Sequence, residues 1–142
     1  RTIPSRDARA EGGYSMGGWG ALHLAFTHPE VFGIVGGHSP SLRPDDGSLY
    51  FLGTGAEFAS KDPISLARTL SISTLKSLQI WLDIGQDDEW LPDVLVLHNI
   101  LAERGIPHTW NVLPGGHLWR YWTEHIIDYL RFYSRAMSPI RR

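Results

Sequence analysis

A serine stands among glycines near the start of the sequence, in the stretch Gly12-Gly13-Tyr14-Ser15-Met16-Gly17-Gly18. The pattern Gly-x-Ser-x-Gly is typical of a nucleophile elbow, a strained strand-to-helix turn that exposes a serine hydroxyl above a sheet. It also occurs by chance in glycine-rich loops. A serine hydroxyl is a poor nucleophile at neutral pH, so it needs a neighbouring base, and that base needs an anion to orient it. The rest of the sequence must therefore supply both if Ser15 is to react.

An acidic cluster and a histidine follow two later predicted strands. The cluster after residues 78–84 consists of Asp87, Asp88 and Glu89. His117 follows the predicted strand 109–113, behind Pro114-Gly115-Gly116. The order serine, acid, histidine, each at the carboxyl end of a strand, is that of serine hydrolases built on a parallel sheet. The sequence thus predicts Ser15 as nucleophile and His117 as base, while the Met16 N–H at the following helix start could stabilise an oxyanion.

Each of these residues also has a structural interpretation. His117 could be a surface or helix-capping residue, the acidic cluster could be a solvated loop, and Asp88 could cap a helix. Six further histidines compete for the role of base: His23, His28, His38, His98, His108 and His125. The sequence contains no cysteine and no histidine spacing typical of a metal site, so we expect neither metal nor cofactor.

The composition predicts a globular domain that acts on a small molecule. Of 142 residues, 42% are hydrophobic and 20% charged, and the formal net charge of −2 argues against nucleic acid or a membrane surface as a partner. No apolar run approaches the roughly 20 residues of a membrane-spanning helix, and no signal-peptide pattern opens the sequence. We therefore expect a soluble protein and favour the cytoplasm.

Short apolar stretches alternate with helical patterns, which predicts an α/β fold with about four mostly parallel strands. The predicted strands are 8–13, 32–35, 78–84 and 109–113. The predicted helices are 19–27, 92–104 and 118–137. Residues 36–40 are expected to form a turn, and residues 41–74 a loop and helical excursion within one domain. The last helix should bury a stripe formed by Leu118, Trp122, Ile126, Tyr129, Leu130 and Tyr133.

Aromatic residues gather near the candidate chemistry. Large aromatic rings commonly serve core packing, but they can also form the wall of a substrate pocket. We expect four of them near the acyl or alcohol group of a substrate: Tyr14, Trp19, Trp90 and Trp119.

Three sequence blocks resemble a known family. They are Gly12 to Gly18 with Ala21-Leu22 and His28-Pro29-Glu30-Val31-Phe32; Leu82-Asp83-Ile84-Gly85-Gln86-Asp87-Asp88; and Val112-Leu113-Pro114-Gly115-Gly116-His117 with Trp122 and Tyr129-Leu130 following. Together they resemble the esterase family of α/β-hydrolases that includes S-formylglutathione hydrolase (esterase D), feruloyl and acetyl-xylan esterases, and the antigen 85 mycolyltransferases. The resemblance implies a serine carboxylesterase but does not fix the substrate. Short-chain acyl esters are the default expectation, because nothing in the sequence suggests a long lipid channel or a clamp for a charged ligand. The family's Gly-x-x-Asp register implies Asp88, not Asp87, as the triad acid.

Two features depart from that family. Glu11 stands where a small or aliphatic strand residue is usual, so we expect it at a strand end, at an exposed edge, or paired with Arg6 or Arg9. The serine pattern also comes about a dozen residues into the sequence, whereas several strands precede it in the family.

The second departure has consequences for partners. The chain resembles the carboxyl-terminal half of such an enzyme, and its first residue, Arg1, suggests a mature product or a fragment. We expect its first strand to have a bare edge, covered by self-association or by an amino-terminal fragment. The alternative function is a truncated half-domain with little or no activity, acting as an interaction or oligomerisation module.

Overall fold

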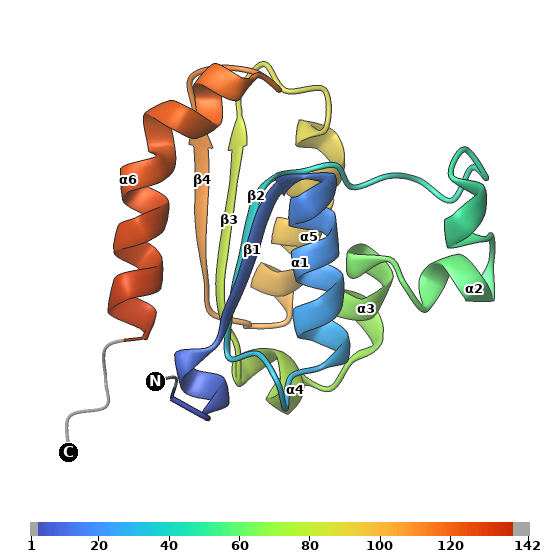
Figure 1. Ribbon diagram of the computed structural model, residues 1–142. Coiled ribbons are helices and arrows are strands. Elements are labelled where there is room, and N and C mark those ends of the chain that lie inside the picture. Colours follow the sequence, from blue (N-terminus) through green and yellow to red (C-terminus); the bar gives the residue numbers. More distant parts are fainter. Residues whose placement is uncertain (1–2, 138–142) are drawn as a thin grey trace.

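Four parallel strands in the order β1-β2-β3-β4 form the sheet of the computed structural model, which describes residues 3–137 (Figure 1). The strands are β1 (Ala10–Ser15), β2 (Ile34–Pro40), β3 (Gln79–Gly85) and β4 (His108–Leu113). Because all four run in one direction, their carboxyl ends lie at the same edge of the sheet. The predicted α/β fold with about four parallel strands is confirmed.

Helices cover both faces of the sheet (Figure 1). The longer helices on one face are α1 (Met16–Thr27), α3 (Pro63–Thr69) and α5 (Leu91–Glu103), and α6 (Trp119–Ala136) lies on the other. Shorter pieces are η1 (Arg6–Ala8), η2 (Tyr50–Leu52), α2 (Ala56–Ala59) and α4 (Ile72–Lys76). The main core lies between the sheet and the first set of helices, and its largest fully buried side chains include Phe26, Leu22, Leu82, Ile84, Leu97 and Leu101.

Strand β2 continues through residues 36–40, where the sequence predicts a turn. That prediction is wrong, because the glycines there serve close packing. A Cβ on Gly36 would lie 2.0 Å from the Tyr133 hydroxyl oxygen, and one on Gly37 would lie 2.9 Å from Leu22 Cδ1. Glycine in a strand interior can mark a close approach of this kind, and here it leaves room for helices on both faces.

Helix α6 buries a narrower face than its apolar stripe predicts. Trp122 and Tyr129 are buried, whereas Ile126 and Leu130 are 46% and 57% exposed. The two exposed side chains line a groove beside β1, and Tyr121, which lies outside the predicted stripe, is buried instead. The helix thus packs on β2 and β3, and the stripe residues Ile126 and Leu130 lie outside its contact with the sheet.

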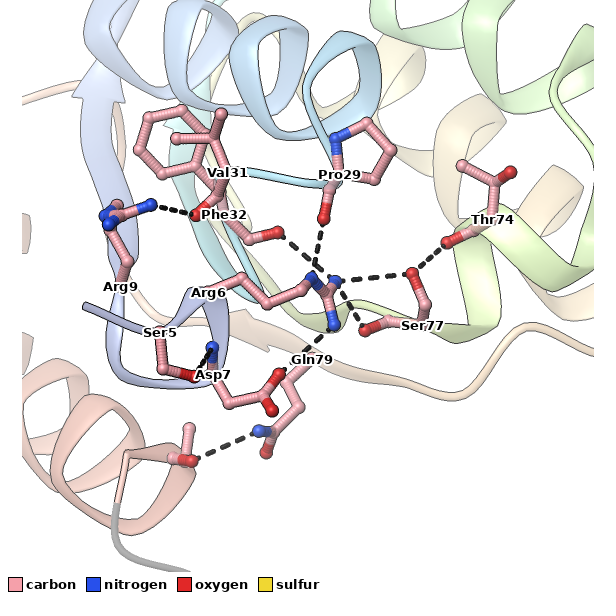
Figure 2. A network of polar contacts seen from close by, with 11 residues as sticks. Ser5, Arg6, Asp7, Arg9, Pro29, Val31, Phe32, Thr74, Ser77 and Gln79 are labelled. Carbon is pink, nitrogen blue, oxygen red and sulfur yellow. Dashed lines mark hydrogen bonds and ion pairs between the residues drawn. The ribbon is translucent and has the colours of Figure 1, made fainter. Parts of the chain in front are cut away.

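Arg6 joins the start of the chain to the amino-terminal end of the sheet (Figure 2). Its guanidinium donates to the backbone carbonyls of Pro29 at 2.6 Å, Phe32 at 3.3 Å and Ser77 at 3.0 Å. It also pairs with Asp7 at 3.2 Å. One side chain therefore ties η1 to the turns that precede β2 and β3, at the amino-terminal edge of the sheet, whereas Ser15 ends β1 at the carboxyl edge.

Strand β1 lies at the edge of the sheet, as the sequence predicts. Among residues 3–137, its strand partner is β2, and Glu11 lies on it with a partly exposed side chain. Arg9 donates to the Val31 carbonyl and Arg6 to the carbonyls described above. Glu11 therefore meets the exposed-edge expectation. Within the same residues, no helix combines the length and the hydrophobicity needed to cross a bilayer.

Candidate active site

Ser15 occupies a sharp turn between the end of β1 and the start of α1. Its backbone angles are φ 56° and ψ −125°, a conformation that non-glycine residues rarely adopt and that costs roughly 1–3 kcal/mol. The neighbouring glycines allow the strand and the helix to meet. A Cβ on Gly13 would lie 2.5 Å from the Gly17 carbonyl carbon, and one on Gly18 would lie 2.8 Å from the Gly13 oxygen.

The structure brings Ser15, His117 and Asp88 together from three strand ends. His117 Nε2 lies 2.8 Å from Ser15 Oγ, and His117 Nδ1 lies 2.8 Å from Asp88 Oδ2. Because an ionised carboxylate only accepts hydrogen bonds, Nδ1–H donates to Asp88 and Nε2 accepts from the serine hydroxyl. The Asp88 side chain is fully buried, whereas that of His117 is 21% exposed. A substrate could therefore reach the serine while the carboxylate stays shielded from water.

Backbone contacts fix the loops that carry the acid and the histidine. The Asp87 N–H donates to the Gly115 carbonyl at 2.9 Å, and a Cβ on Gly85 would lie 2.3 Å from the same oxygen. Asp88 Oδ1 also accepts from the Trp90 N–H at 2.9 Å, just before α5 begins. Asp88 thus takes part in the turn before the helix as well as in the contact with His117, whereas Asp87 is exposed.

The first turn of α1 presents its backbone N–H groups beside Ser15. Met16 is the first residue of α1, and the first N–H groups of a helix have no acceptor within the helix. The positive end of the helix dipole also lies there. The Met16 N–H is therefore placed where negative charge near Ser15 would be stabilised.

Aromatic rings form a cluster that contacts His117 and includes Tyr14, the residue before Ser15. Tyr14 meets Trp119 at a ring-centroid distance of 5.4 Å and Trp122 at 4.7 Å. Trp122 also meets the His117 ring edge-on at 5.1 Å. Sequence reasoning placed Trp122 in the helix stripe and in the family-like block after His117, but it missed this contact with the imidazole ring.

Trp19 and Trp90, the other two predicted pocket residues, come from α1 and the start of α5. Trp19 lines a small pocket of about 60 Å³ with Met16 and Arg43. The Arg43 guanidinium lies 4.4 Å from the centroid of the Trp90 ring, a cation–π contact. Sequence reasoning missed Arg43, because no motif singles out a residue in this irregular segment.

A wider and more polar cleft of about 770 Å³ lies beside His117. Its lining includes Asp87, Glu89, Leu118, Arg120, Tyr121 and Glu124. Between residues 3 and 137, no group of three or more histidine, aspartate or glutamate side chains is arranged to hold a metal ion.

A second buried carboxylate, Asp83, lies under α6 and was not singled out from the sequence. Tyr121 and Tyr129 both donate to it, at 2.8 and 2.9 Å. Burial and the nearby Asp83 charge raise the pKa of both phenols well above the usual range. Both tyrosines therefore remain neutral hydrogen-bond donors.

Comparisons with known proteins show that the chain is similar to several esterases. Curated relatives include iron(III) salmochelin esterase of Escherichia coli O6:H1, 31% identical over 119 residues, which cover 82% of this chain and 28% of that protein. S-formylglutathione hydrolase of Paracoccus denitrificans is 27% identical over 144 residues, covering 94% of this chain and 50% of the relative. The chain thus spans half or less of the length of these relatives.

Solved structures agree with the sequence comparisons. A ferulic acid esterase superposes with a TM-score of 0.84 at 26% identity, covering 96% of this chain and 54% of that one. The profile of the family described as "Putative esterase" matches residues 2–133, which is nearly the whole chain. The chain therefore belongs to this esterase family.

Proposed function

We propose that this chain carries the site of a serine esterase that hydrolyses short-chain carboxylic esters through an acyl-enzyme. The observation that carries the proposal is the unbroken hydrogen-bond chain from Asp88 through His117 to Ser15, with two distances of 2.8 Å. Membership of an esterase family supports the same reaction class. Asp88, His117 and Ser15 act as orienting anion, general base and nucleophile.

The first step forms the acyl-enzyme. Ser15 Oγ attacks the ester carbonyl carbon while His117 Nε2 takes the hydroxyl proton. Asp88 holds Nδ1–H and stabilises the imidazolium, and the Met16 N–H donates to the oxyanion. When the tetrahedral intermediate collapses, the carbon–oxygen bond to the alcohol breaks and His117 returns its proton to that oxygen. The alcohol leaves neutral, and the acyl group remains on Ser15.

The second step releases the acid. A water molecule takes the place of the alcohol, gives a proton to His117 Nε2 and attacks the acyl carbonyl carbon. The bond between that carbon and Ser15 Oγ then breaks, and the proton returns to the serine oxygen. Because His117 is partly exposed, water can reach it without a conformational change.

The surroundings of Ser15 favour a small acyl group. The pocket that Met16 and Trp19 line has a volume of about 60 Å³, far below the roughly 300–1,000 Å³ of pockets that enclose drug-sized ligands. The exposed rings of Tyr14 and Trp119 contact each other outside that pocket's lining, and we assign them as a surface for the larger alcohol portion. This division of acyl and alcohol sides is part of the proposal.

Turnover of p-nitrophenyl acetate and p-nitrophenyl butyrate by the wild type and by Ser15→Ala tests the proposal. We expect Ser15→Ala to lose about 10⁶-fold in kcat, since the nucleophile is removed. Ser73→Ala, at an exposed site on α4, is the matched control and should keep wild-type turnover. A fluorophosphonate should label the wild type and the control but not Ser15→Ala. Equal hydrolysis by the wild type and Ser15→Ala would refute the proposal.

A further inference from the structure

The Asp83 carboxylate is buried completely and accepts hydrogen bonds from two strands and a helix. Its side chain has no exposed surface. Oδ1 accepts from Trp81 Nε1–H at 2.7 Å and from His38 Nδ1–H at 2.7 Å. Oδ2 accepts from the hydroxyls of Tyr121 at 2.8 Å and Tyr129 at 2.9 Å. Four donors thus satisfy a charge whose burial would otherwise cost several kcal/mol.

These contacts hold α6 against the sheet along most of its length. Tyr121 lies in the first turn of the helix and Tyr129 lies eight residues later. A third helix residue, Tyr133, donates its hydroxyl proton to His38 Nε2 at 2.9 Å, while the other nitrogen of that ring serves Asp83. We call the group of Asp83, His38, Tyr121, Tyr129 and Tyr133 the carboxylate clasp.

Within the clasp, Tyr121 contacts the loop that carries His117. A Cβ on Gly115 would lie 3.1 Å from Tyr121 Cδ2, so the loop backbone lies beside the tyrosine ring with little room for a side chain between them. The neighbouring Trp122 meets the His117 ring edge-on at 5.1 Å. The first turn of α6 therefore supports His117 both through the loop backbone and at the imidazole itself.

Tyr129 donates a hydrogen bond to the same Asp83 oxygen as Tyr121 but packs against different residues. Its ring stacks on His38 at a centroid distance of 3.7 Å and meets Trp81 at 6.3 Å. It lies two helical turns beyond Tyr121, where the helix covers the middle of the sheet. Both tyrosines are buried and donate to the same carboxylate oxygen. They differ in how far along α6 they lie from the loop that carries His117.

We propose that Asp83 acts through Tyr121 to position His117 toward Ser15, whereas Tyr129 uses the same carboxylate oxygen only to hold the fold. This inference rests on the proposed esterase function. Tyr121 is a positioning residue here, since it touches the loop at Gly115 and not the reacting atoms. Without its hydroxyl, the ring is no longer fixed by Asp83, and the loop loses its rigid support.

The pair Tyr121→Phe and Tyr129→Phe tests the proposal, because each variant removes one hydroxyl donor from Asp83 Oδ2. We expect similar decreases in thermal midpoint for both variants. Tyr121→Phe should lower kcat on p-nitrophenyl acetate about tenfold at unchanged KM, since small misplacement of a catalytic group slows the chemical step. Tyr129→Phe should keep kcat within about twofold of the wild type. Fluorophosphonate labelling rates should show the same order.

Other outcomes would overturn the inference. Equal decreases in kcat for both variants would mean that the clasp acts only on the fold. A raised KM at unchanged kcat in Tyr121→Phe would mean that this residue contacts substrate. If Tyr121→Phe does not fold, Gly115→Ala disturbs the same contact from the loop side with all clasp hydrogen bonds kept. Because φ at Gly115 is +122°, the alanine also strains the backbone and should lower the thermal midpoint as well as kcat; a wild-type kcat would overturn the inference.

The wild type and Ser15→Ala separate this inference from the proposed function. Wild-type turnover that does not depend on Ser15 would refute the esterase proposal, and the positioning role with it. Ser15-dependent turnover combined with equal behaviour of the two tyrosine variants would refute the positioning role alone.

Discussion

The turn at Ser15 depends on glycine at position 13, and Gly13→Ala is a direct test of that dependence. The added Cβ would lie 2.5 Å from the Gly17 carbonyl carbon and 2.6 Å from its oxygen. Both are backbone atoms, so no side-chain rotation can relieve the contact. To reach 3.4 Å, where ordinary van der Waals contact begins, β1 and α1 must separate by about 0.9 Å, the difference between 3.4 and 2.5 Å.

The size of that displacement sets the expected effects. Overpacking of a tight contact costs about 1–3 kcal/mol, and replacing a strand glycine by alanine returns about 0.5–1 kcal/mol. We therefore expect the free energy of unfolding to fall by up to about 2.5 kcal/mol. A displacement near 1 Å can reduce catalysis about 100-fold, because Ser15 Oγ would leave its 2.8 Å contact with His117 Nε2.

Gly20→Ala is the matched control, because it makes the same chemical change within α1. A Cβ there would have no neighbouring atom within 4 Å, so helix propensity should stabilise the variant by about 1 kcal/mol. Urea unfolding and p-nitrophenyl acetate hydrolysis measure the two effects. We expect Gly20→Ala to keep wild-type turnover. Wild-type stability and turnover in Gly13→Ala would refute the argument that this glycine permits the turn.

Two further predictions concern regions away from the serine. Arg6→Ala should lower the free energy of unfolding in urea by about 2 kcal/mol, since three carbonyl contacts are lost, while Ser15-dependent turnover stays unchanged; a decrease in turnover would contradict it. Burial, with a smaller contribution from His108, lowers the pKa of His98, whose Nδ1 lies 2.8 Å from His108 Nε2. The unfolded chain then binds the proton first as pH falls, so His98 should reduce stability as pH falls below about 6.5. His98→Gln should weaken that dependence in urea unfolding at pH 7.5 and 5.5, and an equal loss in both proteins would contradict the assignment.

Much of the candidate site could be predicted because local patterns determine it. The glycines around Ser15 fix a strand-to-helix turn within a few residues. Parallel strands bring their carboxyl ends to one edge, so Asp88 and His117 could be placed near Ser15 without knowledge of any side-chain contact. The choice of Asp88 over Asp87 needed the family register, since both follow β3 within three residues of Gly85.

The parts that could not be predicted depend on contacts between distant segments. Asp83 lies within an apolar strand pattern, and its tyrosine partners are 38 and 46 residues away in the sequence. Gly36 and Gly37 suggested a turn, but they are required because Tyr133 and Leu22 pack against β2. No periodicity within a single element carries that information, because each pairing arises only when α6 and the sheet meet.

The serine side and the histidine side of the candidate site are held by different forces, so they should be sensitive to different kinds of substitution. The turn at Ser15 is fixed by steric contact between backbone atoms at Gly13 and Gly17, so it should respond to added volume and little to pH. The His117 side is fixed by hydrogen bonds to the buried carboxylates Asp88 and Asp83, so it should respond to the loss of hydrogen-bond donors. Since Ser15 and His117 meet through one 2.8 Å hydrogen bond, either kind of change interrupts the same contact. The effects of Gly13→Ala and Tyr121→Phe on kcat should therefore be less than additive in the double variant, because both changes disrupt the same contact between Ser15 and His117.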